Sequence, residues 1–157
     1  MRRRFLFAIA FALVAMPVIA FAAGRSEPQT MREAGGLVVY LGVLPAEMIR
    51  GHPARHEEAA MHKGPRRGIH LYHVMVAVFD AQTGKRVEDA VVAATVIPLG
   101  LAGTRQTLEP MHIADTTTYG NYFDLGGSSH YRIAVDVQPP GNAKPITVEF
   151  AYQHPVR

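Results

Sequence analysis

Histidine and methionine gather in one stretch of this chain. The sequence has eight histidines, and five of them lie between residues 52 and 73. Methionines are interleaved with these histidines, and another methionine directly precedes a sixth histidine further along. The residues concerned are His52, His56, His62, His70 and His73 with Met48, Met61 and Met75, followed by Met111 and His112. This clustering is the strongest chemical signal in the sequence.

The donor atoms of these side chains favour copper. Because the chain has no cysteine, any soft metal site must be built from imidazole nitrogen and thioether sulfur. Imidazole suits Cu(II), Zn(II) and Ni(II), whereas the thioether of methionine selects Cu(I). Imidazole also releases a metal when it is protonated, so such a site can bind a metal and hand it on. The sequence therefore predicts a site for Cu(I) or Cu(II) with the ligands His52, His56, Met61, His62, His73, Met75, Met111 and His112.

The spacing of these residues indicates which of them act together. His52 and His56 are four residues apart and share a face if a helix begins at or before His52, and Pro53 is compatible with that start. In an extended strand, His73 and Met75 point to the same side. Two other interpretations stay open. The loop histidines could be solvated surface residues, and Met75 could fill a gap in the core.

Motifs for catalysis are absent from the sequence. There is no Gly-x-Ser-x-Gly elbow, no cysteine nucleophile, no His-Glu-x-x-His pair and no glycine-rich phosphate loop. The segment His56-Glu57-Glu58 lacks the second histidine that a zinc protease needs. We therefore expect a binding protein rather than an enzyme.

The N-terminus has the pattern of an export signal. Three arginines at Arg2–Arg4 precede an apolar stretch, and Ala20–Ala22 supplies a small-residue cleavage site. The pattern predicts a signal peptide over residues 1–22 and a periplasmic protein without a stable membrane anchor. An uncleaved anchor is the alternative, but Pro17 interrupts an apolar run that barely reaches the roughly 20 residues of a spanning helix. The three arginines account for the whole net charge of +3, so the remaining chain has no electrostatic footprint for nucleic acid.

The rest of the chain predicts an all-β domain. Residues 23–35 are polar and aperiodic and are expected to form a flexible leader, and residues 36–157 form one domain. Short segments rich in β-branched residues, several of them alternating between apolar and polar positions, predict strands at 36–44, 71–79, 91–97, 106–111, 117–125, 131–137 and 146–152. About seven strands with little helical periodicity are typical of an immunoglobulin-like antiparallel β-sandwich.

One long connection does not fit a minimal sandwich. Residues 45–70 follow the first predicted strand and have no strand pattern of their own. Loops of this length in compact domains are usually functional or disordered. A short helix over residues 53–62 is the one element expected here. The two strands flanking this His- and Met-rich loop must therefore position the ligands.

Several segments of the chain resemble a family of exported domains. They are "VAVFDAQTGKRVEDAVVAATV", "LEPMHI", "TTTYGNYFDL" and "HYRIAVDVQPPG". This text is similar to the periplasmic YtkA-like and FixH-like domains and, more distantly, to CopC-like copper-resistance sandwiches. The matching residues are Asp80, Gly84, Ala90, Val91, Met111, Gly120, Tyr122, Pro140 and Gly141. The resemblance implies an immunoglobulin-like exported domain associated with copper handling or with assembly of membrane oxidases.

The sequence leads to two hypotheses about function. The first is a periplasmic copper carrier, chaperone or sensor, whose partners are the metal ion and a protein that takes part in metal transfer or complex assembly. The second is an interaction module without metal, an accessory subunit of a membrane complex or exported enzyme, with Arg66, Arg67 and Tyr72 as contacts. The two differ in whether the histidine and methionine side chains converge.

Overall fold

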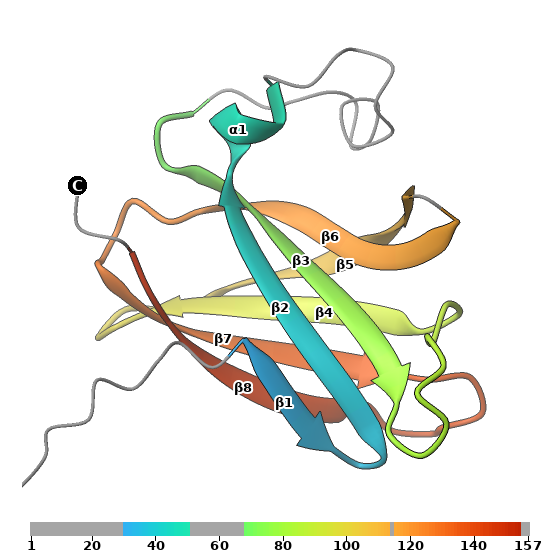
Figure 1. The fold of residues 1–157 in the computed structure, drawn as a ribbon. Coiled ribbons are helices and arrows are strands. Elements are labelled where there is room, and N and C mark those ends of the chain that lie inside the picture. The colour runs from blue at the N-terminus through green and yellow to red at the C-terminus, as the bar shows by residue number, and fades with distance from the viewer. Residues whose placement is uncertain (1–29, 51–67, 114, 155–157) are drawn as a thin grey trace, which may run out of the picture.

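The fold is built almost entirely from antiparallel strands. The computed structural model describes residues 30–50, 68–113 and 115–154. Within these ranges it has one short helix, α1 (Ala46–Arg50), and eight strands (Figure 1). The strands are β1 (Met31–Ala34), β2 (Leu37–Pro45), β3 (Leu71–Asp80), β4 (Val91–Pro98), β5 (Thr104–Ile113), β6 (Thr116–Asp124), β7 (His130–Gln138) and β8 (Ile146–Gln153).

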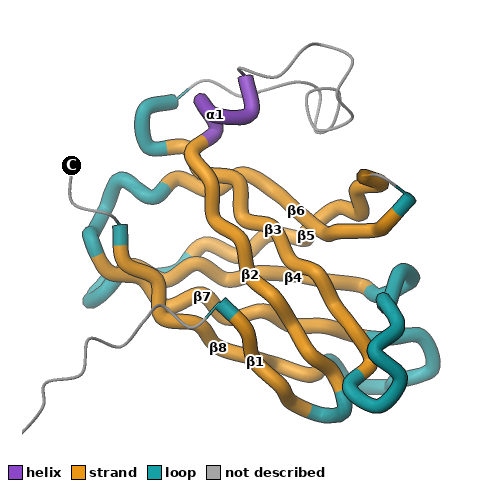
Figure 2. Tube along the Cα trace, in the orientation of Figure 1, coloured by secondary structure: helices purple, strands orange, loops and turns teal. Residues whose placement is uncertain are grey.

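The strands follow the order β1-β2-β3-β6-β5-β4-β7-β8. β5 is the corner at which the sheet folds over into a second layer. Its first half, residues 104–108, pairs with β4, and its second half, residues 109–113, pairs with β6. The two layers lie face to face, with β2 and β3 in front of β4 and β7 in the view of Figure 2. The predicted all-β sandwich is confirmed, and the described residues form eight strands where about seven were expected.

The core lies between these layers and follows the two-residue period of the strands. Val74, Val76 and Val78 of β3 point into it, as do the alternate residues of β7 that the sequence pattern predicted. The continuous apolar run of β2 is typical of a strand buried on both faces, but the structure buries only one of them. Its inner side chains are buried, but Tyr40 on the outer face is 45% exposed. The outer face of β2 is therefore open to solvent at Tyr40.

β1 is a strand that the sequence analysis missed. Its residues were assigned to the flexible leader, but they pair with β2 through a two-residue turn. Gly35 and Gly36 both have positive φ, 56° and 78°. This is the backbone that a tight hairpin turn requires, and a Gly-Gly pair provides it without steric cost. The predicted strands all form, with boundaries that differ from the predicted ones by at most two residues.

The long connection leaves and rejoins the fold beside β3. α1 follows β2 directly, and the predicted helix over residues 53–62 lies outside the described residues. Pro45 at the end of β2 pairs with Tyr72 near the start of β3. In the described part of the chain, no helix has the length and apolar character needed to cross a membrane.

Candidate metal centre

His73 and Met75 lie on the outer face of β3, as their spacing predicts. The valines between and beyond them point into the core, so the alternation of the strand directs both donors away from it. His73 is nevertheless only 1% exposed, and Met75 is half-buried. β3 pairs with β2 on one side and with β6 on the other, which fixes the backbone of both residues.

β6 places Gly120 and Tyr122 beside these donors. Met75 pairs with Gly120, and His73 pairs with Tyr122. The rings of His73 and Tyr122 have centroids 4.8 Å apart and planes inclined by 37°. Tyr122 is itself buried, in a small cluster with Ala46 at the start of α1 and with Leu71. The imidazole is therefore held against a phenol ring that is fixed in turn by two neighbouring elements.

Met111 reaches the same place from β5. It pairs with Thr118 of β6, two residues before Gly120, and it is 1% exposed. A Cβ atom built on Gly120 would lie 2.6 Å from Met111 Cε and 2.8 Å from His73 Nε2. The side chain of any residue other than glycine at position 120 would therefore collide with Met111 and with His73. The absence of a side chain at Gly120 thus creates the space in which an imidazole nitrogen and a methionine end meet.

Two side-chain amides hold the strands where β5 turns away from β6. Asn121 Nδ2 donates to Thr107 O at 2.8 Å, and Gln106 Nε2 donates to Tyr122 O at 2.8 Å. The backbone ladder between β5 and β6 ends at the pair Glu109 and Gly120. The two side-chain bonds connect β5 and β6 past this point, where their backbones no longer pair. They fix the angle at which β5 leaves, and with it the approach of Met111 to Gly120.

Replacing Asn121 with alanine is expected to destabilise this corner. The variant loses the bond to Thr107 O and the one that Asn121 Oδ1 accepts from Tyr122 N at 2.8 Å. We expect the free energy of unfolding to fall by about 1–3 kcal/mol, which urea denaturation measures. Asn142→Ala, in the exposed turn before β8, should change it by less than about 0.5 kcal/mol. Equal losses in the two variants would contradict the role given to Asn121.

The other predicted ligands are placed differently. His112 follows Met111 in β5, so the alternation of the strand turns it to the opposite face. It is exposed, and its Nδ1 lies 3.2 Å from Thr117 Oγ1. The remaining four, His52, His56, Met61 and His62, lie outside the described residues. Across the described ranges, no three histidine, aspartate or glutamate side chains gather into a metal-binding group.

Gly120 and Tyr122 were not among the residues expected from the sequence to position a ligand. Both entered only as matches to the turn and strand pattern of a resembling family. Gly120 had a usable signal, because an isolated glycine within a strand indicates a bulge or a close approach by another group. Tyr122 had none, since its position beside His73 depends on the pairing of β3 with β6.

The donor set of this site fits copper in its reduced state. The residues around Gly120 are one histidine and two methionines: His73 Nε2 and the terminal methyl carbon of Met111 lie near its Cβ position, and Met75 pairs with Gly120 across the ladder. Thioether sulfur is a soft ligand that favours Cu(I) over the harder divalent ions. The burial of His73 and Met111 limits the access of water to these two side chains. A closed, soft site of this kind suits the binding of Cu(I).

Comparison with known proteins supports the fold. No protein-family model and no curated protein sequence matches the chain. Among solved structures, a DUF4426 family protein from Pseudomonas aeruginosa PAO1 is 17% identical to this chain, with a TM-score of 0.59. The match covers 79% of this chain and 92% of the Pseudomonas chain. A copper-bound variant of FetP from uropathogenic Escherichia coli strain F11 is 14% identical with a TM-score of 0.59, covering 79% and 93%.

The protein P19 of Campylobacter jejuni is a third neighbour. Its copper-bound variant is 15% identical with a TM-score of 0.59, and the match covers 79% of this chain and 93% of that one. Identities this low show the fold alone. The resemblance in sequence to copper-handling sandwich domains predicted a fold of this kind. The chain shares the all-β fold of FetP and P19, two proteins that have been solved with copper bound.

Proposed function

We propose that this chain is an exported copper-binding protein that acts as a carrier, chaperone or sensor. Its site is centred on Gly120 and uses His73, Met75 and Met111. The observation that carries the proposal is the convergence of His73 Nε2 and Met111 Cε on one point, 2.8 Å and 2.6 Å from the Cβ position of Gly120. Copper-bound proteins of the same fold support the choice of metal.

Each residue has a distinct part in this proposal. His73 offers a ring nitrogen, and the stacked ring of Tyr122 sets the plane of its imidazole. Met111 closes the site from β5 and adds the soft sulfur that favours Cu(I). Met75 is the one of the three that is half-exposed, so it faces the side from which copper arrives and leaves.

The segment between α1 and β3 completes the proposed ligand set. His52, His56, Met61 and His62 belong to it, and both of its ends are anchored beside the site. Leu44 of β2 pairs with His73. β2 ends at the next residue, and α1 follows it directly. We expect the triple change of His52, His56 and His62 to alanine to lower copper affinity by about 10–100-fold. Isothermal titration that matches the parent protein would show that this segment supplies no ligand.

Export is part of the same proposal. We propose that the signal pattern over residues 1–22 directs the chain to the periplasm and is then cleaved. FetP, which has the same fold, has been expressed recombinantly in the periplasm of Escherichia coli BL21(DE3). The intact mass of protein recovered from a periplasmic extract should correspond to a chain that begins at residue 23. A mass that includes residues 1–22 would instead indicate a retained anchor.

The main test of the site is the change Met111→Leu. Leucine keeps the buried volume and removes the sulfur, so stability should change by less than about 1.5 kcal/mol. We expect the Cu(I) affinity, measured by competition with a chromophoric Cu(I) chelator, to fall at least about tenfold. Met48→Leu is the matched control, because Met48 on α1 is 58% exposed. The proposal fails if the two variants bind Cu(I) equally well.

The rival interaction module loses one of its expected contacts. Tyr72 lies on the inner side of β3, and its ring centroid is 4.7 Å from that of His154. It therefore packs against the core instead of presenting its ring to a partner. Arg66 and Arg67, the other two contacts of that hypothesis, lie outside the described residues.

A further inference from the structure

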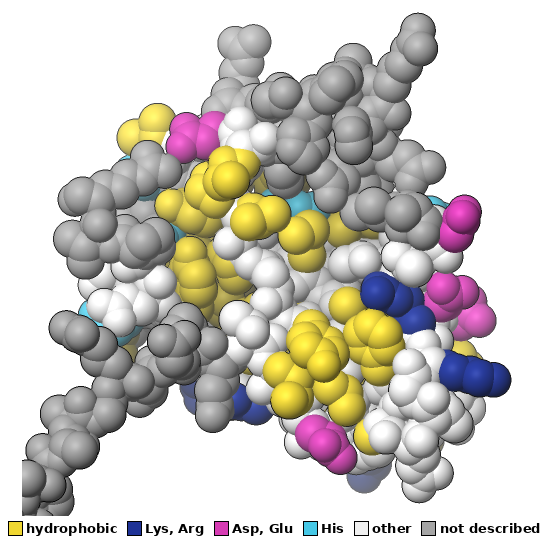
Figure 3. All heavy atoms as spheres, viewed as in Figure 1, with side chains coloured by type: hydrophobic (Ala, Val, Ile, Leu, Met, Phe, Trp, Pro, Cys, Tyr) yellow, Lys and Arg dark blue, Asp and Glu magenta, His cyan; other side chains and the backbone are white. Residues whose placement is uncertain are grey.

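A hollow lies on the outer face of the same strands, further along β3 from Met75. Its volume is about 490 Å³ and it is open to solvent. Small-molecule sites in proteins usually have volumes of roughly 300–1,000 Å³. Figure 3 shows an apolar area over β2 and β3 with basic side chains beside it. The lining residues are Val38, Tyr40, Ala77, Phe79, Asp80, Ala81, Gly84 and Arg86.

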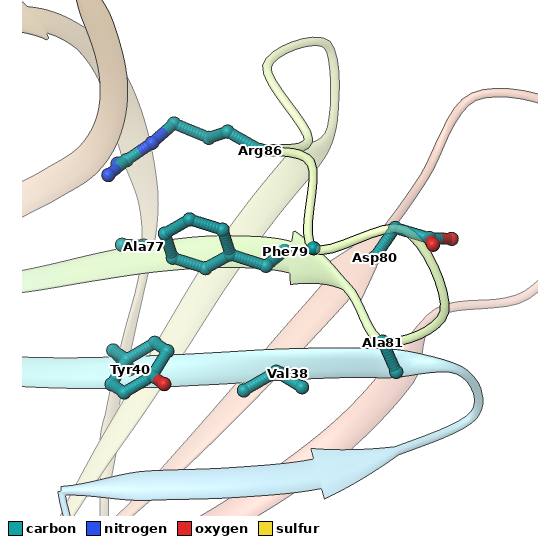
Figure 4. A pocket seen from close by; sticks show the side chains of 8 residues that line it. Val38, Tyr40, Ala77, Phe79, Asp80, Ala81 and Arg86 are labelled. Carbon is teal, nitrogen blue, oxygen red and sulfur yellow. The ribbon is translucent and has the colours of Figure 1, made fainter.

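Two aromatic rings form its apolar part. Tyr40 and Phe79 lie edge to face, with centroids 5.6 Å apart and planes at 84°. Ala77 pairs with Tyr40 across the ladder. Because its side chain is short, it forms the floor of the hollow beside the two larger rings. The sticks in Figure 4 show the rings on neighbouring strands with Ala77 and Val38 beside them. The two rings therefore provide apolar surfaces against which the flat apolar part of a small molecule can pack.

Arg86 supplies a cation that is held in place. Its guanidinium carbon lies 4.7 Å from the centroid of Phe79. Nη1 donates to Thr117 O at 2.9 Å and makes a longer contact with Thr118 Oγ1 at 3.4 Å. A guanidinium has five N–H donors, and within the described part of the chain the hydrogen bonds of Arg86 use this one nitrogen. Nε and Nη2 are thus available to a carboxylate, in a plane that stacking on Phe79 has already fixed.

Asp80 prevents an anion from binding at the other end. Its Oδ1 accepts hydrogen bonds from Thr83 Oγ1 at 2.8 Å, from Thr83 N at 2.7 Å and from Gln82 N at 3.1 Å. These bonds from Thr83 and Gln82 lower the pKa of Asp80, so its carboxylate stays ionised. In Figure 4 the guanidinium and this carboxylate lie at opposite ends of the aromatic surface. A ligand with one negative charge therefore has one favourable orientation.

We propose that this hollow binds a small apolar monocarboxylate, such as an aromatic or branched aliphatic acid. The carboxylate binds Arg86 through Nε and Nη2, and the apolar body packs against Tyr40 and Phe79. The site is separate from the Gly120 centre and does not depend on copper. Its charge and shape select an acid over the neutral molecule of the same size.

The test compares 3-phenylpropanoate with its neutral analogue 3-phenylpropanamide, using copper-free protein labelled with nitrogen-15. We expect the acid to shift the amide signals of Ala77, Phe79 and Arg86 with a dissociation constant of about 1–10 mM, as for a ligand of this size. The amide should bind about tenfold more weakly, because it lacks the charge-assisted bonds to Arg86. Equal binding of the two compounds, or no shift with either, would overturn the proposal.

Variants separate recognition by Arg86 from its structural role. Arg86→Gln should remove the preference for the acid, so that the acid and the amide bind about equally weakly, whereas the control variant Arg132→Gln on the far layer should keep the preference. Should Arg86→Gln fail to fold, Tyr40→Ala provides a second test, since Tyr40 is exposed and its loss should weaken binding of both compounds. Signals that shift with protein concentration alone would show a second copy on this face, and the proposal would then be wrong.

Discussion

Replacing Gly120 with alanine should abolish high-affinity Cu(I) binding. The new methyl group would lie 2.6 Å from Met111 Cε and 2.8 Å from His73 Nε2, closer than atoms of this kind can approach. Met111 can bend away at its flexible end, but the imidazole is held by Tyr122. We expect Cu(I) affinity to fall by about 100-fold or more, because the new methyl group would occupy the space between His73 and the end of Met111. Overpacking should also cost about 1–3 kcal/mol of stability.

Gly42→Ala is the matched control for this change. Gly42 lies on β2, opposite Met75 on the same outer face. A Cβ atom there would be 3.4 Å from Met75 Cε, which is an ordinary contact distance. Its Cu(I) affinity should therefore stay close to that of the parent in the chelator competition. If Gly120→Ala also binds like the parent, copper does not occupy the space above Gly120.

Replacing His73 with phenylalanine should have a comparable effect on copper with a smaller effect on folding. Phenylalanine keeps a ring against Tyr122 and removes both nitrogens. Exchange of a buried polar ring for an apolar ring of similar shape is expected to cost less than about 1.5 kcal/mol. The parent should gain about 2.7 kcal/mol of stability when free Cu(I) is at 100 times its dissociation constant, whereas the variant should gain almost none.

Thermal or urea unfolding with and without Cu(I) measures this difference. His130→Phe is the control, because His130 is exposed at the start of β7 and its Nδ1 lies 2.9 Å from Ser129 Oγ. That variant should keep the full stabilisation by copper. A His73→Phe protein that copper still stabilises as strongly as the parent would remove His73 from the ligand set.

Strands with a regular local pattern were predictable from the sequence. The alternation in β7 and the β-branched residues of β3 and β4 identify their faces without knowledge of their partners. β1 was not identified because four residues are too few to show a period. Its only clear marker was the Gly35-Gly36 turn, which also fits an irregular leader.

The site was predictable only in part, for a related reason. The shared face of His73 and Met75 follows from the period of one strand. The approach of Met111 does not, because it depends on β5 pairing with β4 and then with β6. Nothing in the residues near Met111 specifies that change of partner. The position of Met111 in the candidate site therefore depends on pairing between strands that are distant in the sequence, which the local pattern does not predict.

The change of partner within β5 also divides the site in terms of local stability. His73 and Met75 sit on a strand with ladder bonds on both sides, so their amides should exchange with solvent only when much of the sheet opens. Met111 sits on a half-strand with one partner, next to Pro110, which cannot donate a backbone bond. Its amide should exchange through a smaller opening. The proposed site would then have a permanent half on β3 and a separable half on β5, and we expect Met111 to move away from His73 and Met75 while the rest of the sheet stays folded.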